Sequence, residues 1–136
     1  MARTCALRLG GAAATLVLLL GALAGCANNS LAPFQPQITN AADNFQLQAT
    51  GVSNVSTTLS YAWSNSGTQA TINHATTTTA GTTVLVIKDG ANVTVYNKAL
   101  AASLNEPTSA GQAGTWTVQL TLTNYSGTLN LRAQKL

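Results

Sequence analysis

The chain has 136 residues and only nine charged side chains, six basic and three acidic, which is 7% of the sequence. In soluble domains about a quarter of the residues are usually charged. The low charge here argues against an acid/base enzyme with several carboxylates, a cage of acidic metal ligands and a basic nucleic-acid surface. The length indicates one domain, with room for a tail.

The N-terminal segment has the layout of an export signal. Arg3 and Arg8 form a short basic region, and the seventeen residues from Leu9 to Gly25 carry no charge and are rich in Leu and Ala. A positive head, an apolar middle and small residues at the end are typical of a bacterial signal peptide. A transmembrane helix is the competing interpretation, but this run lies at the lower limit for crossing about 30 Å of hydrocarbon and contains several glycines.

The apolar run ends in Leu23-Ala24-Gly25-Cys26, which resembles the lipobox of bacterial lipoproteins. The resemblance implies that a signal peptidase recognises Leu23, Ala24 and Gly25, that residues 1–25 are removed, and that Cys26 carries palmitate-type acyl chains. Two or more buried acyl chains hold a protein stably at a membrane where one does not. Because Ala27 rather than Asp follows Cys26, the same resemblance implies the outer membrane of a Gram-negative cell, at its periplasmic face or at the surface.

Removal of the signal changes the chemistry that the chain offers. Cys5 leaves with the signal and Cys26 carries lipid, so no disulfide is expected. The remaining chain has four basic and three acidic residues, which is a net charge of +1. This charge does not predict nucleic-acid binding, which needs basic residues clustered on one surface. Residues 26–42 contain two prolines and many polar side chains, and we expect them to form the lipidated Cys and a tether.

Residues 43–136 predict a single all-β domain. Trp116, Val118, Leu120 and Leu122 alternate with polar residues, which is typical of a half-buried strand. Asp89-Gly90 is a hairpin signal between two strand-like runs. The expected fold is an antiparallel β-sandwich of jelly-roll type with seven or eight strands. The predicted strands are residues 43–51, 55–64, 67–74, 82–89, 92–97, 114–124 and 127–134, with a possible short strand near 106–109.

Four local features complete this prediction. The run from Val84 to Ile87 is apolar on both faces and indicates a central strand. Residues 76–79 are four threonines and are expected to form a loop, and residues 98–105 could form one helical turn. Arg132 and Lys135 in the last strand would suit a sheet edge that needs protection from pairing.

The stretch from Thr82 to Gln134 has the order apolar strand, Lys88-Asp89-Gly90, glycine-rich turn, Trp116-Thr117-Val118, Tyr125-Ser126-Gly127 and final strand. This order is similar to the C-terminal halves of pre-peptidase C-terminal and CUB-like jelly-roll domains. The similarity implies a non-catalytic accessory module. Several such domains bind calcium through clustered acids, and the three dispersed acids of this chain do not match that feature, so no metal is expected.

Few residues are candidates for catalysis. His74 is the only histidine, it lies in no nucleophile motif, and we expect it to be a solvated loop residue. Asp43, Asp89 and Glu106 would have to form a carboxylate pair for glycoside hydrolysis, but Asp89 is better explained as the turn residue of the hairpin. No catalytic residue, cofactor or metal ligand is therefore assigned.

The aromatic residues are the remaining candidates for ligand binding. Trp63 and Trp116 are in register with inward-facing residues, so we expect both in the core. Tyr96 is expected on the same strand face as Thr94, away from Val93 and Val95, and Tyr125 is expected in a turn. These two tyrosines are therefore the exposed candidates for ligand binding.

These features predict a lipid-anchored, non-enzymatic protein of the cell envelope whose β-sandwich binds a protein or polymer partner. The alternative is a carbohydrate-binding module that uses exposed Tyr and Trp side chains.

Overall fold

The computed structural model describes residues 34–136, and this part of the chain is all-β. Seven strands form one antiparallel sheet, and no helix occurs among the described residues. The strands are β1 (Gln37–Ala41), β2 (Asn44–Asn65), β3 (Ala70–His74), β4 (Thr77–Lys88), β5 (Thr94–Ala99), β6 (Leu104–Pro107) and β7 (Gly114–Lys135). The predicted fold class is confirmed for this part, while the signal segment and the lipobox, including Cys26, lie outside the described residues.

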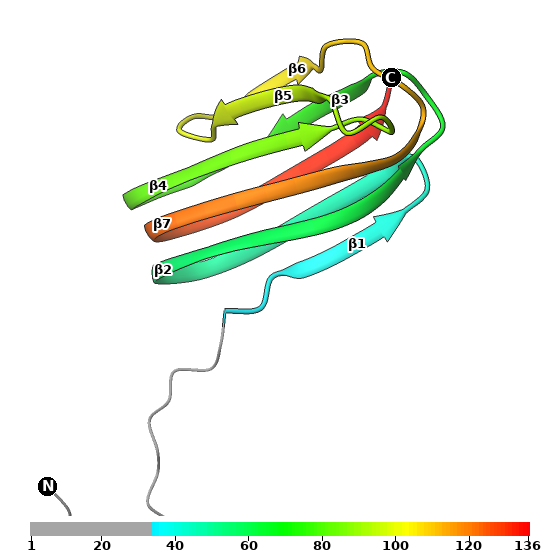
Figure 1. Cartoon of the computed structure of the whole chain (residues 1–136). Helices are drawn as coiled ribbons and strands as arrows, with labels where there is room; N and C mark the ends of the chain where they lie inside the picture. The colour runs from blue at the N-terminus through cyan, green and yellow to red at the C-terminus, as the bar shows by residue number, and fades with distance from the viewer. Residues whose placement is uncertain (1–33) are drawn as a thin grey trace, which may run out of the picture. The chain divides into compact units, whose positions relative to one another are not determined.

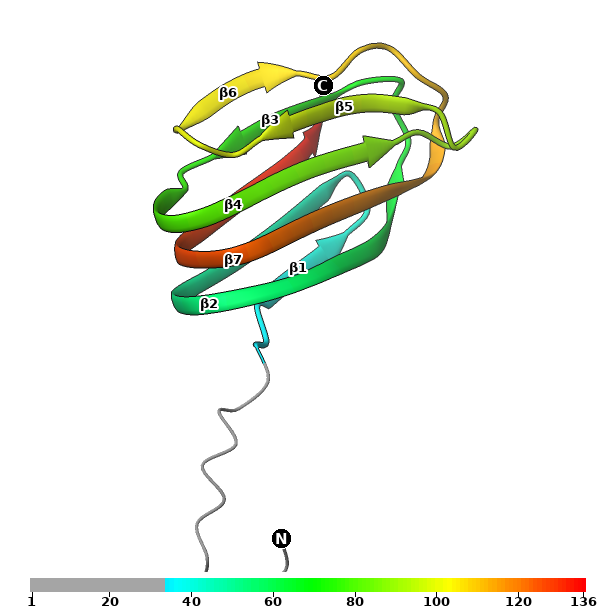
Figure 2. The ribbon, with the colours of Figure 1, turned by 60° about the vertical axis from the view of Figure 1, so that its left-hand side comes forward.

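The strands β2 and β7 are each 22 residues long, and both curve so strongly that the sheet folds over itself into two layers (Figures 1 and 2). Their pairing shifts register between Ala49 and Thr57 of β2. In this region Asn54 of β2 and Asn124 of β7 adopt left-handed backbone conformations. Such irregularities bend a strand and increase its twist. Each half of β2 and β7 was expected as a separate strand, but the pairing continues through both bends.

The two layers share the long strands. Layer A contains β1, the first half of β2, the second half of β7, β3 and β6, in that order. Layer B contains the second half of β2, the first half of β7, β4 and β5, in that order. Because β7 has a neighbour on each side in both layers, the expectation that the last strand is a sheet edge is wrong.

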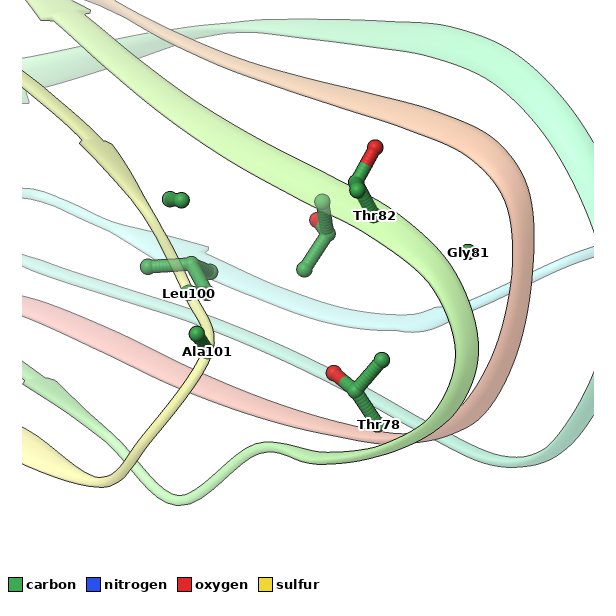
Figure 3. Close-up of a pocket in the computed structure, with 7 residues that line it drawn as sticks. Thr78, Gly81, Thr82, Leu100 and Ala101 are labelled. Carbon is green, nitrogen blue, oxygen red and sulfur yellow. The ribbon is translucent and has the colours of Figure 1, made fainter.

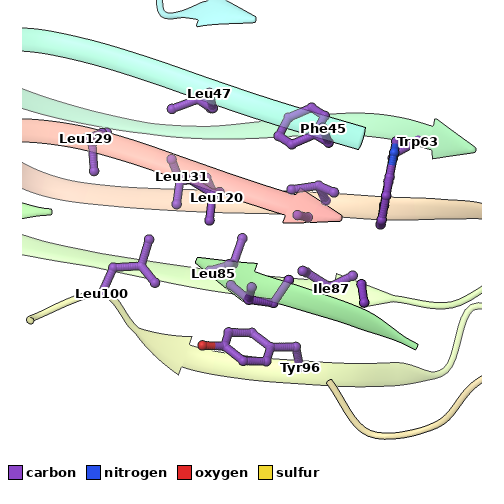
Figure 4. Close-up of a cluster of buried hydrophobic side chains, with 14 of the residues drawn as sticks. Phe45, Leu47, Trp63, Leu85, Ile87, Tyr96, Leu100, Leu120, Leu129 and Leu131 are labelled. Atoms are coloured by element: carbon purple, nitrogen blue, oxygen red, sulfur yellow. The ribbon is translucent and has the colours of Figure 1, made fainter. Parts of the chain in front are cut away.

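The core lies between the layers and receives every second side chain of the paired strands (Figure 4). The prediction that Trp63 and Trp116 are buried is confirmed, with 1% and 0% of their surfaces exposed. Their rings meet edge to face, with centroids 5.8 Å apart. Each indole N–H has a partner, because Trp63 Nε1 donates to the carbonyl of Ala41 and Trp116 Nε1 to that of Gln112.

Three segments differ from the sequence prediction. Residues 37–41, expected in the tether, form β1, because Ile38 packs against the core and the strand pairs with β2. Residues 77–79, expected in a loop, begin β4 and pair with β7. Residues 98–105 contain no helical turn, since they end β5 and begin β6. The prediction that the Val84–Ile87 run is a central strand is confirmed by its pairing with β5 and β7.

Candidate functional site

The outer surface of layer A is covered by side-chain amides, and we call it the amide face. Strand pairing places on it Gln37, Asn44, Gln46, Gln48, Asn73, Asn105, Asn130 and Gln134. These residues share one face because the residues between them, such as Leu47 and Leu131, point into the core. One row of paired residues crosses all five strands of the layer in the order Thr39, Gln46, Arg132, Asn73, Asn105.

Arg132 lies at the centre of the amide face and is its one charged residue. The side chain is exposed and forms no ion pair with another described residue. Within the described part, the side-chain amides that form hydrogen bonds are those of Asn40, Asn65, Gln69 and Asn124, none of which lies on this face. Each amide can donate and accept, and a guanidinium binds carboxylate or phosphate oxygens in a planar fork. The face therefore suits a hydroxyl-rich or weakly anionic polymer, or a peptide backbone.

The outer surface of layer B is different, and we call it the hydroxyl face. It presents the side chains of Thr58, Ser60, Ser64, Thr82, Thr115, Thr117, Thr121 and Thr123, with the half-buried Val84 and Val86 between them. The hydroxyl oxygens of Thr58 and Thr121 lie 3.4 Å apart across two neighbouring strands. Neither face was predicted from the sequence. The alternation marks which residues are polar, but the pairing of distant strands decides which of them meet.

The expectation that Tyr96 and Tyr125 are exposed ligand-binding residues is wrong. Tyr96 is 5% exposed, because a bulge between Ile87 and Lys88 changes the alternation in β5 and turns both Val95 and Tyr96 inward. Tyr125 is fully buried at the bend of β7, where its hydroxyl lies 3.1 Å from the carbonyl oxygens of both Thr77 and Thr128. Burial raises the pKa of Tyr96 and that of Tyr125. Neither ring can stack on a ligand in this arrangement.

The expectation that His74 is a solvated loop residue is also wrong. His74 ends β3, pairs with Leu104 of β6 and Leu131 of β7, and is 2% exposed. Its spacing from Ala70 and Ile72 was the sequence signal for an inward direction. Both ring nitrogens are buried without a hydrogen-bond partner in the described part, so no Ser or Thr hydroxyl is activated by this ring. Burial lowers the pKa of His74, and the charge of the nearby Glu106 opposes this effect in part.

This buried imidazole predicts a stability that falls on mild acidification. The pKa of His74 is below 6.5 in the folded state, so the unfolded chain takes up the proton more readily, and stability is lost as the pH falls below about 6.5. The slope is limited to one proton, about 1.4 kcal/mol per pH unit. Folding also lowers the carboxyl pKa values of Asp43, Asp89 and Glu106. The stability that these carboxylates contribute is lost only as the pH falls through about 4, where carboxyls of the unfolded chain take up protons. Urea unfolding at pH 7.5, 6 and 5 should show the loss for the natural chain and a flat profile for His74→Leu, and a loss that persists in the variant would contradict the assignment.

The three acids occupy separate structural positions. Asp43 accepts hydrogen bonds from the backbone N–H and hydroxyl of Ser66, which lower its carboxyl pKa, and lies 3.4 Å from Lys135 Nζ. Glu106 forms an ion pair with Lys98, which lowers the pKa of Glu106. Within residues 34–136, no group of three His, Cys, Asp or Glu side chains is placed to hold a metal ion.

Asp89 organises the turn between β4 and β5, and its predicted role as a turn residue is confirmed. The carboxylate accepts backbone N–H bonds from Val93, Ala91 and Gln112, with N···O distances of 2.8, 3.0 and 2.8 Å. These bonds lower the pKa of the carboxyl, the bond from Val93 having the largest effect. The bond from Gln112 also joins this turn to the loop that precedes β7.

A small pocket opens between β4 and the segment that follows β5 (Figure 3). Its lining includes Thr78, Gly81, Thr83 and Leu100, and its volume is about 80 Å³. Sites for small-molecule ligands usually measure about 300–1,000 Å³, while a water molecule occupies about 30 Å³. The pocket therefore has room for a few water molecules and is too small for a typical small-molecule ligand.

In comparisons with protein-family models, curated proteins and solved structures, nothing matches this chain. The resemblance of residues 1–26 to lipoprotein signals and the similarity of residues 82–134 to jelly-roll accessory domains thus stay predictions. Among the residues that the structure describes, no helix has the length and apolar character needed to span a membrane.

Proposed function

We propose that the mature protein is a lipid-anchored, non-enzymatic protein of the bacterial cell envelope that binds a protein or polymer partner through the amide face. The observation that carries this proposal is the face itself. Its eight side-chain amides form no hydrogen bond with other described residues, and they surround the exposed guanidinium of Arg132. The Oδ1 atom of Asn44 is buried, but a partner can use the other donors and acceptors without breaking bonds inside the fold.

The lipobox resemblance supports attachment through Cys26, and the start of the fold supports a short connection. Phe34 already packs against the core, and β1 begins at Gln37. The ten residues between Cys26 and β1 reach at most about 35 Å when fully extended. Acyl chains on Cys26 would thus keep the sandwich near the membrane surface.

The use of the ionisable side chains supports binding rather than catalysis. Asp43 and Asp89 hold turns, and Glu106 pairs with Lys98. His74 lies in the core without an orienting partner in the described part. Each of these four groups is committed to the fold.

The alternative of a carbohydrate-binding module with exposed Tyr or Trp rings is disfavoured in that form. Trp63, Trp116, Tyr96 and Tyr125 are all buried, and Tyr61 is half-buried on the inner side of β2. A glycan would instead be held by hydrogen bonds from the amide face. This possibility is one outcome of the experiment below.

A photocrosslinking experiment in intact cells tests the proposal. A benzophenone amino acid at Gln46, in the central row of the amide face, is expected to give a discrete adduct with a protein or a glycan. The same group at Val93, which is 58% exposed in the β4–β5 turn, is the matched control and should give none. Arg132→Ala should weaken the Gln46 adduct several-fold. Equal adducts at both positions, or none at Gln46, would contradict the role of this face.

The anchor is tested in the same cells with Cys26→Ser. The natural chain should take up radioactive palmitate and sediment with membranes, and the variant should lose both properties. If the Gln46 adduct forms in the chain with Cys26 and is lost when Cys26→Ser is added, the partner lies at the membrane. A natural chain without label that is released in soluble form would contradict the lipid anchor.

A further inference from the structure

We infer that the second half of β2 pairs edge to edge with the same segment in a second copy of the chain. This inference goes beyond the proposed function, since neither the lipid anchor nor the amide face requires it. Four strand segments border the two layers: β1 and β6 in layer A, and β5 and residues 57–65 of β2 in layer B. A border strand offers unpaired backbone groups to other chains unless the protein protects it.

Three of these borders are protected. The strand β6 has four residues and ends in Pro107. The strand β5 is covered in part by the segment between β6 and β7, because the N–H of Ser109 donates to the carbonyl of Val95. The strand β1 has five residues, and its Asn40 side chain and Ala41 carbonyl are bonded to β2.

The border formed by residues 57–65 has no such protection along most of its length. It pairs with β7 over nine residues without a register shift, and it contains no charge and no proline. The carbonyls of Ala62 and Ser64 point away from β7, since they accept from Asn40 Nδ2 and from the N–H of Asp43, both at 2.8 Å. By the alternation of an antiparallel strand, Thr58 and Ser60 turn their N–H and C=O groups in the same direction. No strand among the described residues pairs with them there.

Apolar side chains are incompletely covered next to this border. Leu59 and Tyr61 are half-buried, although their cross-strand partners Leu120 and Val118 in β7 are each only 1% exposed. An added strand would cover the outer sides of both half-buried residues while it satisfied the backbone groups. Backbone bonding and apolar burial therefore favour an occupant at the same place.

The positions of the available backbone groups define one register for a second copy. A two-fold axis at Leu59 places Thr58 of one copy opposite Ser60 of the other. Each such pair exchanges two hydrogen bonds, and Leu59 faces its own counterpart at a Cα distance of about 4.5 Å. Layer B would then continue across both copies without a break.

The chemistry of the segment favours a second copy as the occupant. Residues 55–65 carry no charge, so two copies meet without repulsion between like charges. Thr58 and Ser60 are small and polar on the outer side, and Leu59 and Tyr61 are apolar on the inner side, so the pattern complements itself under a two-fold rotation. Two-fold contacts are the commonest form of self-association.

Disulfide trapping in the full-length chain tests the inference. Leu59→Cys in intact cells treated with a mild oxidant should give a band at twice the monomer mass that disappears on reduction. The expected Cα distance lies within the range that a disulfide tolerates. The natural chain controls for Cys5 and Cys26, and Val93→Cys controls for random collision at an exposed position; neither should form the band.

A second change separates pairing at this edge from other contacts. Ser60→Lys, added to Leu59→Cys, brings two positive charges to the border and should reduce the dimer band several-fold. Thr82→Lys, on an exposed position of β4, is the matched control and should leave the band unchanged. No dimer band from a folded Leu59→Cys chain, a dimer band insensitive to Ser60→Lys, or a disulfide to a different protein would each overturn the inference. The proposed binding at the amide face would survive any of these results, because it is measured at Gln46.

Discussion

Replacing Trp116 with alanine is expected to lower the free energy of unfolding by about 3–5 kcal/mol. The side chain is fully buried, its ring meets that of Trp63 edge to face, and its N–H donates to the carbonyl of Gln112 at 2.7 Å. The change therefore leaves a large cavity and removes one of the two hydrogen bonds to the Gln112 carbonyl, which keeps the N–H of Gly90 as a donor. Since small domains are stable by about 5–15 kcal/mol, this change removes a large fraction of the total stability. Urea denaturation followed by far-UV circular dichroism measures the loss.

Two control variants make this result specific. Trp116→Phe keeps most of the apolar contact and loses the indole N–H, so its loss should be clearly smaller than that of alanine. Val93→Ala removes methyl groups from a side chain that is 58% exposed and should change the free energy of unfolding by less than about 0.5 kcal/mol. A loss below about 1 kcal/mol for Trp116→Ala would contradict the central position of this indole in the core.

Replacing Gly127 with alanine is expected to cost about 2 kcal/mol or more, because this residue lies where β7 bends between the layers. Its φ of 147° is unfavourable for a residue with a side chain. A Cβ atom at this position would lie 1.9 Å from the carbonyl oxygen of Thr77 in β4, which is backbone and cannot turn aside. That carbonyl also lies 3.1 Å from the Tyr125 hydroxyl, so its displacement should disturb the bend. Thermal unfolding of the purified chain measures the change.

Gly51, at the corresponding bend of β2, offers a matched control for Gly127. Its φ is 64°, but an added Cβ would have no atom within 4 Å. Gly51→Ala should therefore cost only the left-handed backbone term, about 1–2 kcal/mol. If both variants lose the same stability, the close approach of β4 to β7 at the second bend is not the cause.

Much of the fold was accessible from the sequence because the strand signal is local. Alternation along residues 114–124 places Trp116 and Leu120 on one side of a strand whatever that strand pairs with. The Asp89 turn was found for the same reason, since its carboxylate satisfies backbone N–H groups within four residues of itself. The predictions were wrong where pairing with another segment determines the local structure. The segment of β1 has only one strongly apolar residue and becomes a strand by pairing with β2.

The candidate site was much less predictable. Tyr96 alternates with apolar neighbours in the sequence, yet a one-residue bulge in its pairing turns it into the core. His74 lies beside a polar threonine run, yet its neighbours in β6 and β7 bury it. A residue's exposure depends on atoms from strands that are far away in the chain, and single-strand patterns do not contain that information.

The sequence by itself determined the resemblance of residues 1–26 to a lipoprotein signal, the low charge, and the alternation that makes the described part an antiparallel β-sandwich. These are properties of composition and of short segments. Only the tertiary structure decided that amides from residues 37–48, 73, 105 and 130–134 form one face, and that residues 57–65 are an unprotected border. The physical reason is that surfaces and edges arise from pairing between distant strands, and the bends of β2 and β7 determine which strands can meet.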